Sequence, residues 1–69
     1  MMDPNANLRD QEDLIREIAE YADNRKHPAR ALAVSDLLDL RQALYDWIRE
    51  GGFEPDWTVA PNARQHYGR

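Results

Sequence analysis

Two histidines and thirteen acidic residues are the side chains in this 69-residue sequence that could bind a metal or move protons. A protein metal site needs ligands that one helix face or one loop brings together, as in His-x-x-His or Glu-x-x-His spacing. His27 and His66 lie far apart in the chain, and neither belongs to such a pair. Acidic residues on predicted helices usually form a solvated face. We therefore expect no metal site and no cofactor.

Nucleophilic or acid–base catalysis would have to use Ser35, Thr58 or a carboxylate, since the chain has no cysteine. Ser35 stands where a helix N-cap is expected, which already gives its hydroxyl a structural role. General acid–base catalysis needs a carboxylate or an imidazole whose pKa is shifted inside a cleft. A two-helix domain has little interior in which to form that cleft. The sequence therefore predicts that the protein is not an enzyme.

Gly51-Gly52 and the basic stretch 25–30 are the features that could contact phosphate. A phosphate-binding glycine loop precedes a helix, whereas this glycine pair follows one and is expected to cap it. The basic stretch offers three cations, too few for the several phosphate contacts that nucleic-acid affinity requires. The whole chain carries a net charge of −4 and has an isoelectric point near 4.9. We therefore do not expect nucleic-acid binding.

Length and composition predict one small domain, residues 1–69, without a membrane-spanning segment. Apolar residues make up 42% of the chain, and no apolar run approaches the roughly 18 residues that a spanning helix needs. The N-terminus lacks the pattern of a signal peptide, so we expect a cytoplasmic location. A domain this short, without a disulfide or a metal, often gains stability by self-association. We expect a homo-oligomer and favour a dimer.

The elements that position these residues begin with a predicted amphipathic helix over about 4–25. Asp3 is a good N-cap residue, and Pro4 suits the first helical position. Apolar residues at helical spacing then form one stripe: Leu8, Ile15, Ile18, Ala19 and Ala22. Gln11 lies inside this stripe and needs either a hydrogen-bond partner there or a place near an open end.

A second helix is predicted over about 35–50, preceded by a short third helical turn at 28–34. Ser35 is its expected N-cap, and the glycine pair ends it. Five residues at 3-4-3 spacing form the seam of a packed helix pair: Leu37, Leu40, Leu44, Trp47 and Ile48. Leu38 and Tyr45 lie outside this seam, so either the C-terminal tail or another copy of the chain should meet them.

Residues 53–69 show no sustained helical or alternating period, and we predict an extended aromatic tail. Phe53 and Trp57 are expected to fold against the helices. The predicted fold is therefore all-α: an antiparallel two-helix hairpin with an extended aromatic C-terminal tail, self-associating into a helical bundle.

Residues 35–57 also carry a recurring pattern, an acidic, leucine-rich helix followed by a stop and an aromatic hook. The residues of this pattern are Trp47, Gly51, Gly52, Phe53, Pro55 and Trp57. The pattern resembles the C-terminal part of small helical proteins of unknown function encoded by actinobacteriophages, mycobacteriophages especially. The opening segment, Met2 to Asn5, is also similar to how such proteins begin. The resemblance implies a phage origin and a place in the cytoplasm of an infected bacterium, and it implies no chemistry.

These features together predict a small protein–protein interaction module that binds and modulates a host or phage protein. The residues expected to hold the partner are Phe53, Trp57, Arg64, Tyr67 and Arg69. Acidic helix faces would steer the module toward a basic partner. One alternative is a self-assembling structural or virion-associated subunit whose only partner is itself. A DNA-binding or regulatory module is a weaker alternative, because the second helix carries four acids and two arginines.

Overall fold

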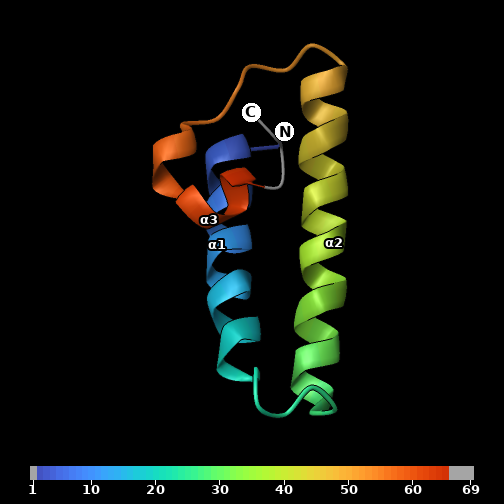
Figure 1. The fold of residues 1–69 in the computed structure, drawn as a ribbon. Helices are drawn as coiled ribbons and strands as arrows, with labels where there is room; N and C mark the ends of the chain where they lie inside the picture. The colour runs from blue at the N-terminus through green and yellow to red at the C-terminus, as the bar shows by residue number, and fades with distance from the viewer. Residues whose placement is uncertain (1, 66–69) are drawn as a thin grey trace.

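The structure, a computed structural model, describes residues 2–65, and every regular element in that range is helical (Figure 1). Two long helices, α1 (Pro4–Glu20) and α2 (Pro28–Arg49), pack side by side in opposite directions. A 3₁₀ turn, η1 (Trp57–Val59), and a short helix, α3 (Pro61–Arg64), then return to pack against α1. The predicted all-α helical hairpin is confirmed.

Helix α1 begins as its sequence indicates and ends earlier than we predicted. The Asp3 carboxylate accepts hydrogen bonds from the backbone N–H groups of Asn5 and Ala6, at 3.0 and 3.2 Å. The predicted end at residue 25 is wrong, because the helix ends at Glu20 and a series of turns follows. Residues 22–26 are exposed, including Ala22 at the end of the apolar stripe. Packing therefore does not stabilise a longer helix here.

Helix α2 begins at Pro28, so the predicted start at Ser35 is wrong and the segment 28–34 is the beginning of α2 rather than a separate turn. The N-cap is His27, whose Nδ1 accepts a hydrogen bond from the backbone N–H of Ala29 at 3.1 Å. Proline at the first helical position costs no hydrogen bond, and the residues that follow are good helix formers. Ser35 is an exposed residue in the helix interior.

The glycine pair ends α2, as the sequence indicates. Gly51 has a φ of 94°, in the left-handed region that glycine adopts without strain. The backbone N–H of Gly52 donates to the Trp47 carbonyl at 2.8 Å. A Cβ atom on Gly52 would overlap the Trp47 indole, so this position has no room for a larger residue.

Up to residue 65, the segment after α2 is not an extended tail, and that part of the prediction is wrong. Asp56 donates its backbone N–H to Asn5 Oδ1 at 2.6 Å, which ties the segment to the start of α1. The buried Glu12 carboxylate then accepts hydrogen bonds from the backbone N–H groups of Asn62 and Ala63, both at 3.1 Å. It also accepts one from Asn62 Nδ2 at 2.8 Å. A side chain on α1 thus caps α3.

The core lies where α3 and η1 pack on α1, next to Leu44 of α2. Its fully buried apolar residues are Leu8, Leu44, Ala60 and Ala63. Gln11 is fully buried and donates to Asn7 Oδ1 at 2.7 Å, while Asn7 Nδ2 donates to the Leu40 carbonyl at 3.1 Å. The expected hydrogen-bond partner of Gln11 is therefore present. Of the other seam residues, Leu37 is buried, whereas Leu40, Trp47 and Ile48 are half-buried.

Candidate functional site

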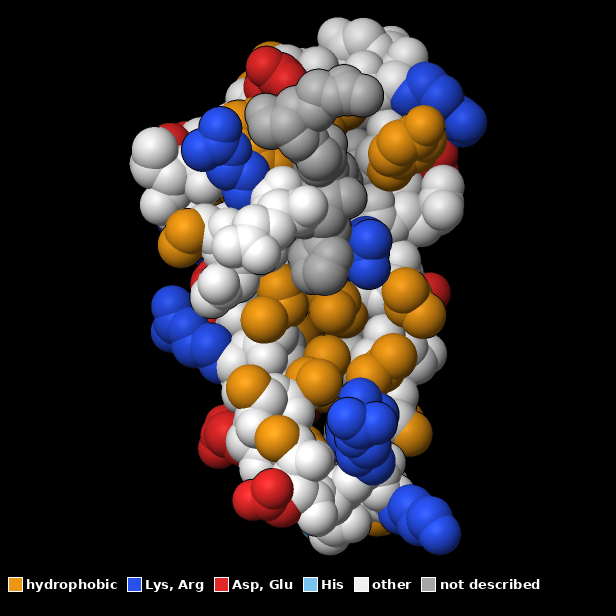
Figure 2. Space-filling view, in the orientation of Figure 1, with side chains coloured by type: hydrophobic (Ala, Val, Ile, Leu, Met, Phe, Trp, Pro, Cys, Tyr) orange, Lys and Arg blue, Asp and Glu red, His pale blue; other side chains and the backbone are white. Residues whose placement is uncertain are grey.

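One side of α2 carries apolar and basic side chains together, and we call it the α2 flank. Nine positions at helical spacing form it: Arg30, Ala31, Val34, Leu38, Arg41, Gln42, Tyr45, Ile48 and Arg49. None of these nine positions is acidic, although the whole chain has an excess of acids. Figure 2 shows hydrophobic side chains gathered over the two long helices below α3.

The flank exposes two large apolar side chains. Leu38 is 54% and Tyr45 is 55% exposed. We predicted that either the tail or a second copy would meet these residues. The described part of the tail does not bury them, because η1 and α3 pack on α1. Two tail residues, Glu54 and Trp57, line a hollow together with Tyr45, and residues 66–69 lie outside the described part of the chain, so both alternatives stay predictions.

A hollow of about 330 Å³ lies at the C-terminal end of the flank, and we call it the Trp57 pocket. Its lining residues are Tyr45, Ile48, Arg49, Glu54 and Trp57. Trp57 is half-buried and also packs against the core, so its position is fixed by the fold. Arg49 lies 5.7 Å from the centre of the Tyr45 ring and 3.0 Å from a carboxylate oxygen of Asp46. The pocket can hold an apolar side chain, with charges of both signs beside it.

Of the predicted partner-binding residues that the structure describes, Trp57 and Arg64 line one hollow, and Phe53 is not among its lining residues. Phe53 is 58% exposed, and its ring packs edge-on against Trp47 at 5.4 Å between ring centres. Its carbonyl accepts the hydrogen bond of Trp47 Nε1 at 2.8 Å. The hollow that Arg64 and Trp57 line has a volume of about 480 Å³ and is also lined by neighbouring residues of η1 and α3. Tyr67 and Arg69 lie outside the described residues.

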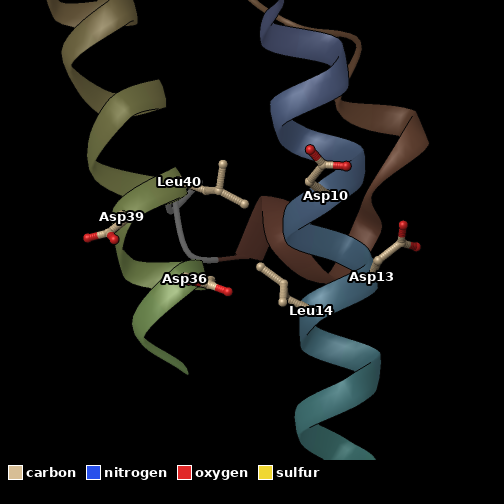
Figure 3. Close-up of a pocket in the computed structure, with 6 residues that line it drawn as sticks. All are labelled: Asp10, Asp13, Leu14, Asp36, Asp39 and Leu40. Atoms are coloured by element: carbon tan, nitrogen blue, oxygen red, sulfur yellow. The ribbon is translucent and has the colours of Figure 1, made fainter. Parts of the chain in front are cut away.

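The opposite side of the hairpin carries an acidic groove between α1 and α2, of about 470 Å³ and widely open to solvent (Figure 3). Its lining residues are Asp10, Asp13, Leu14, Asp36, Asp39 and Leu40. The leucine side chains point toward one another across the gap between the helices, whereas Asp13 and Asp39 point outward. Our sequence reasoning missed this groove. Its signal was the spacing Asp-x-x-Asp-Leu, which occurs once on each long helix.

The carboxylates of the acidic groove have little compensation from cations. Asp13 lies 4.0 Å from Arg16 in an exposed pair, which contributes little to stability. Among residues 2–65, Asp10, Asp36 and Asp39 form no salt bridge. The groove therefore combines an apolar floor with negative charge that a basic partner would neutralise.

Within residues 2–65, no three His, Asp or Glu side chains are placed to hold a metal ion together. In the same range, no helix combines the length and the apolar character needed to cross a bilayer.

The chain matches no protein-family model, no curated protein and no solved structure.

Proposed function

We propose that this protein is a small protein-binding module that holds a partner on the α2 flank and in the Trp57 pocket, with no chemistry of its own. The observation that carries the proposal is the pair Leu38 and Tyr45, each more than half exposed on a face without acidic residues. Exposed apolar side chains that cluster beside polar ones are typical of protein interfaces.

The Trp57 pocket supplies an anchor point for this interface. Binding energy in protein complexes concentrates in a few well-packed side chains, with Trp, Tyr and Arg over-represented among them. The pocket is lined by one residue of each of these three types: Trp57, Tyr45 and Arg49. A partner would insert an apolar side chain here and cover Leu38 with the neighbouring part of its surface.

The charges of the α2 flank indicate what kind of partner it would bind. The flank contributes three arginines, of which Arg49 is paired with Asp46 beside the flank, whereas Arg30 and Arg41 have no salt bridge among residues 2–65. Its partner should therefore carry carboxylates around an apolar feature. The likeness of residues 35–57 to actinobacteriophage proteins supports a phage-encoded module acting in the host cytoplasm, on a host or phage protein. A self-assembling subunit is the second candidate, favoured by the acidic groove on the other side of α2.

The experiment is affinity capture with immobilised protein and three variants. The bait is offered an actinobacterial lysate and a differently tagged copy of this chain, and retained proteins are identified by mass spectrometry. Leu38→Ala and Tyr45→Ala should weaken binding of the captured protein about 30-fold, the effect of a 2 kcal/mol interface residue. Leu32→Ala is the matched control, because Leu32 is 68% exposed on α2 outside the flank.

The proposal fails if the wild-type bait retains neither a lysate protein nor the tagged copy. It also fails if Leu38→Ala and Tyr45→Ala bind as tightly as the wild type. Circular dichroism of each variant separates lost binding from lost folding. These outcomes test binding at the α2 flank and do not test binding at the acidic groove.

A further inference from the structure

We infer that the acidic groove is the docking site for the α2 flank of a second copy of this chain, so that copies associate head to tail. The inference rests on the proposed function, because it takes the flank as the binding surface and names its partner. The observation behind it is that one chain carries both halves of a complementary pair on opposite sides of α2.

The first match between the two surfaces is apolar. Leu14 and Leu40 form the floor of the acidic groove, one from each long helix, with their side chains pointing toward one another. Leu38 is the exposed leucine of the flank, with Val34 one turn before it and Arg41 and Gln42 one turn after it. Placed between the two floor leucines of another copy, Leu38 would lose its contact with water.

The second match is electrostatic. Asp10 and Asp36 stand beside the floor on opposite walls, and neither has a salt-bridge partner among residues 2–65. Arg41 follows Leu38 by three residues, which puts it on the same face about 5 Å further along the helix. An arginine at that distance reaches the carboxylates of a groove that holds Leu38. Each copy would thus neutralise charges that have no salt bridge among residues 2–65 of a single chain.

Charge also argues against other arrangements of two copies. A symmetric dimer that joined flank to flank would bring together two surfaces whose charged residues are all arginines, and like charges oppose that contact. A groove-to-groove contact would do the same with aspartates. Flank to groove is the pairing that brings opposite charges together.

The two surfaces can be used at the same time. Leu38 and Leu40 are two residues apart, which places them on nearly opposite sides of α2. A copy that donates its flank therefore still has its acidic groove free. Such head-to-tail contacts close into a ring or continue as an open chain.

The experiment compares the solution mass of the wild type, a groove variant and a flank variant by light scattering from micromolar to millimolar concentration. The groove variant is Asp10→Lys/Asp36→Lys, and the flank variant is Leu38→Asn/Arg41→Gln. The wild-type mass should rise with concentration to multiples of 8.1 kDa. Each variant alone should stay at 8.1 kDa, because each has lost one half of the contact.

Mixing the two variants is the decisive step. The flank of the groove variant and the groove of the flank variant are both intact, so the mixture should form a complex of two chains and grow no further. The control for the groove variant is Asp23→Lys/Glu50→Lys, which changes the net charge by the same amount at exposed positions outside both surfaces and should keep the association of the wild type.

Three outcomes would overturn the inference. One is a wild type that stays at 8.1 kDa throughout, whatever other protein the flank captures. Another is a groove variant that associates like the wild type, which would place the contact elsewhere. The third is a mixture that forms no two-chain complex. The inference is also wrong if the groove binds a Lys- and Leu-rich helical peptide while the wild type stays monomeric, because a second copy is then not its partner.

Discussion

The two ends of the hairpin differ in how completely they are packed. At the covered end, where η1 and α3 lie on α1, Leu8, Leu44, Ala60 and Ala63 are fully buried. At the open end, residues 15–37, the buried apolar residues are Ala33 at 2% and Leu37 at 8% exposure. The same two helices run through both ends, so the difference comes from the third layer of structure that only the covered end has.

This difference shows which part of so small a chain has its apolar residues shielded from water and which part does not. A pair of helices alone leaves part of each apolar stripe in contact with water, because each helix has one neighbour. At the covered end, α3 shields the apolar stripe from water, so the apolar burial that stabilises the fold is greatest there. At the open end, apolar side chains of the stripe stay in contact with water, as Figure 2 shows below α3.

The largest expected effect is on stability at the covered end. Leu44→Ala should lower the free energy of unfolding by about 2–5 kcal/mol, because it empties a fully enclosed site. Leu37→Ala, at the open end, should fall near the lower limit of that range, since water can already reach its surroundings. Urea unfolding followed by circular dichroism measures both.

Leu38→Ala is the control for this pair, because an exposed leucine should change stability by less than about 0.5 kcal/mol. If Leu37→Ala destabilised the protein as much as Leu44→Ala, the two ends would be equally well packed. A domain of this size has only about 3–5 kcal/mol of stability, so the Leu44 variant is expected to be largely unfolded.

An intermediate effect is expected from Glu12, whose carboxylate holds α3 in place. Glu12 is 3% exposed and accepts its hydrogen bonds from Asn62 and Ala63. Glu12→Ala leaves these donors without their acceptor and should cost about 1–3 kcal/mol. Amide hydrogen exchange should rise in α3 and η1 and stay unchanged at the open end.

Glu17→Ala is the matched control, since Glu17 is an exposed acid on the same helix. Unchanged exchange at Asn62 and Ala63 in the Glu12 variant would show that α3 is held by its apolar contacts alone. In that case the covered end would owe its order to Leu8 and Leu44 rather than to the carboxylate.

Local signals predicted the parts of the fold that local chemistry determines. Asp3-Pro4 indicated the start of α1, and Gly51-Gly52 the end of α2, because capping depends on residues close in sequence. The start of α2 escaped prediction because its cap is a histidine, a residue rarely used there, while Ser35 offered a more usual one.

The covered end and the acidic groove could not be predicted in the same way. Helix α3 depends on a carboxylate about fifty positions earlier in the chain, and four residues with one proline give little helical signal of their own. The groove depends on the register of α1 against α2, which brings Leu14 near Leu40. The periodicity of each helix predicts which side chains share a face, but not which faces meet.

The smallest expected effect is a pH dependence confined to the covered end. Hydrogen bonds from the Thr58 hydroxyl and backbone N–H lower the pKa of Asp56 below its ordinary value of 3.8, and the charge of Arg9 adds to this. A carboxyl whose pKa is lower in the folded state stabilises the fold above the unfolded value and loses that contribution as the pH falls through the folded one. The free energy of unfolding of Asp56→Asn should therefore be lower than that of the wild type at neutral pH, and the two values should converge in acid below pH 3.8.

An NMR titration measures the pKa of Asp56 directly. In Thr58→Val, this pKa should move up toward 3.8. If Asp56 of the folded wild type already had a pKa of 3.8, the hydrogen bonds from Thr58 would not favour the charged form.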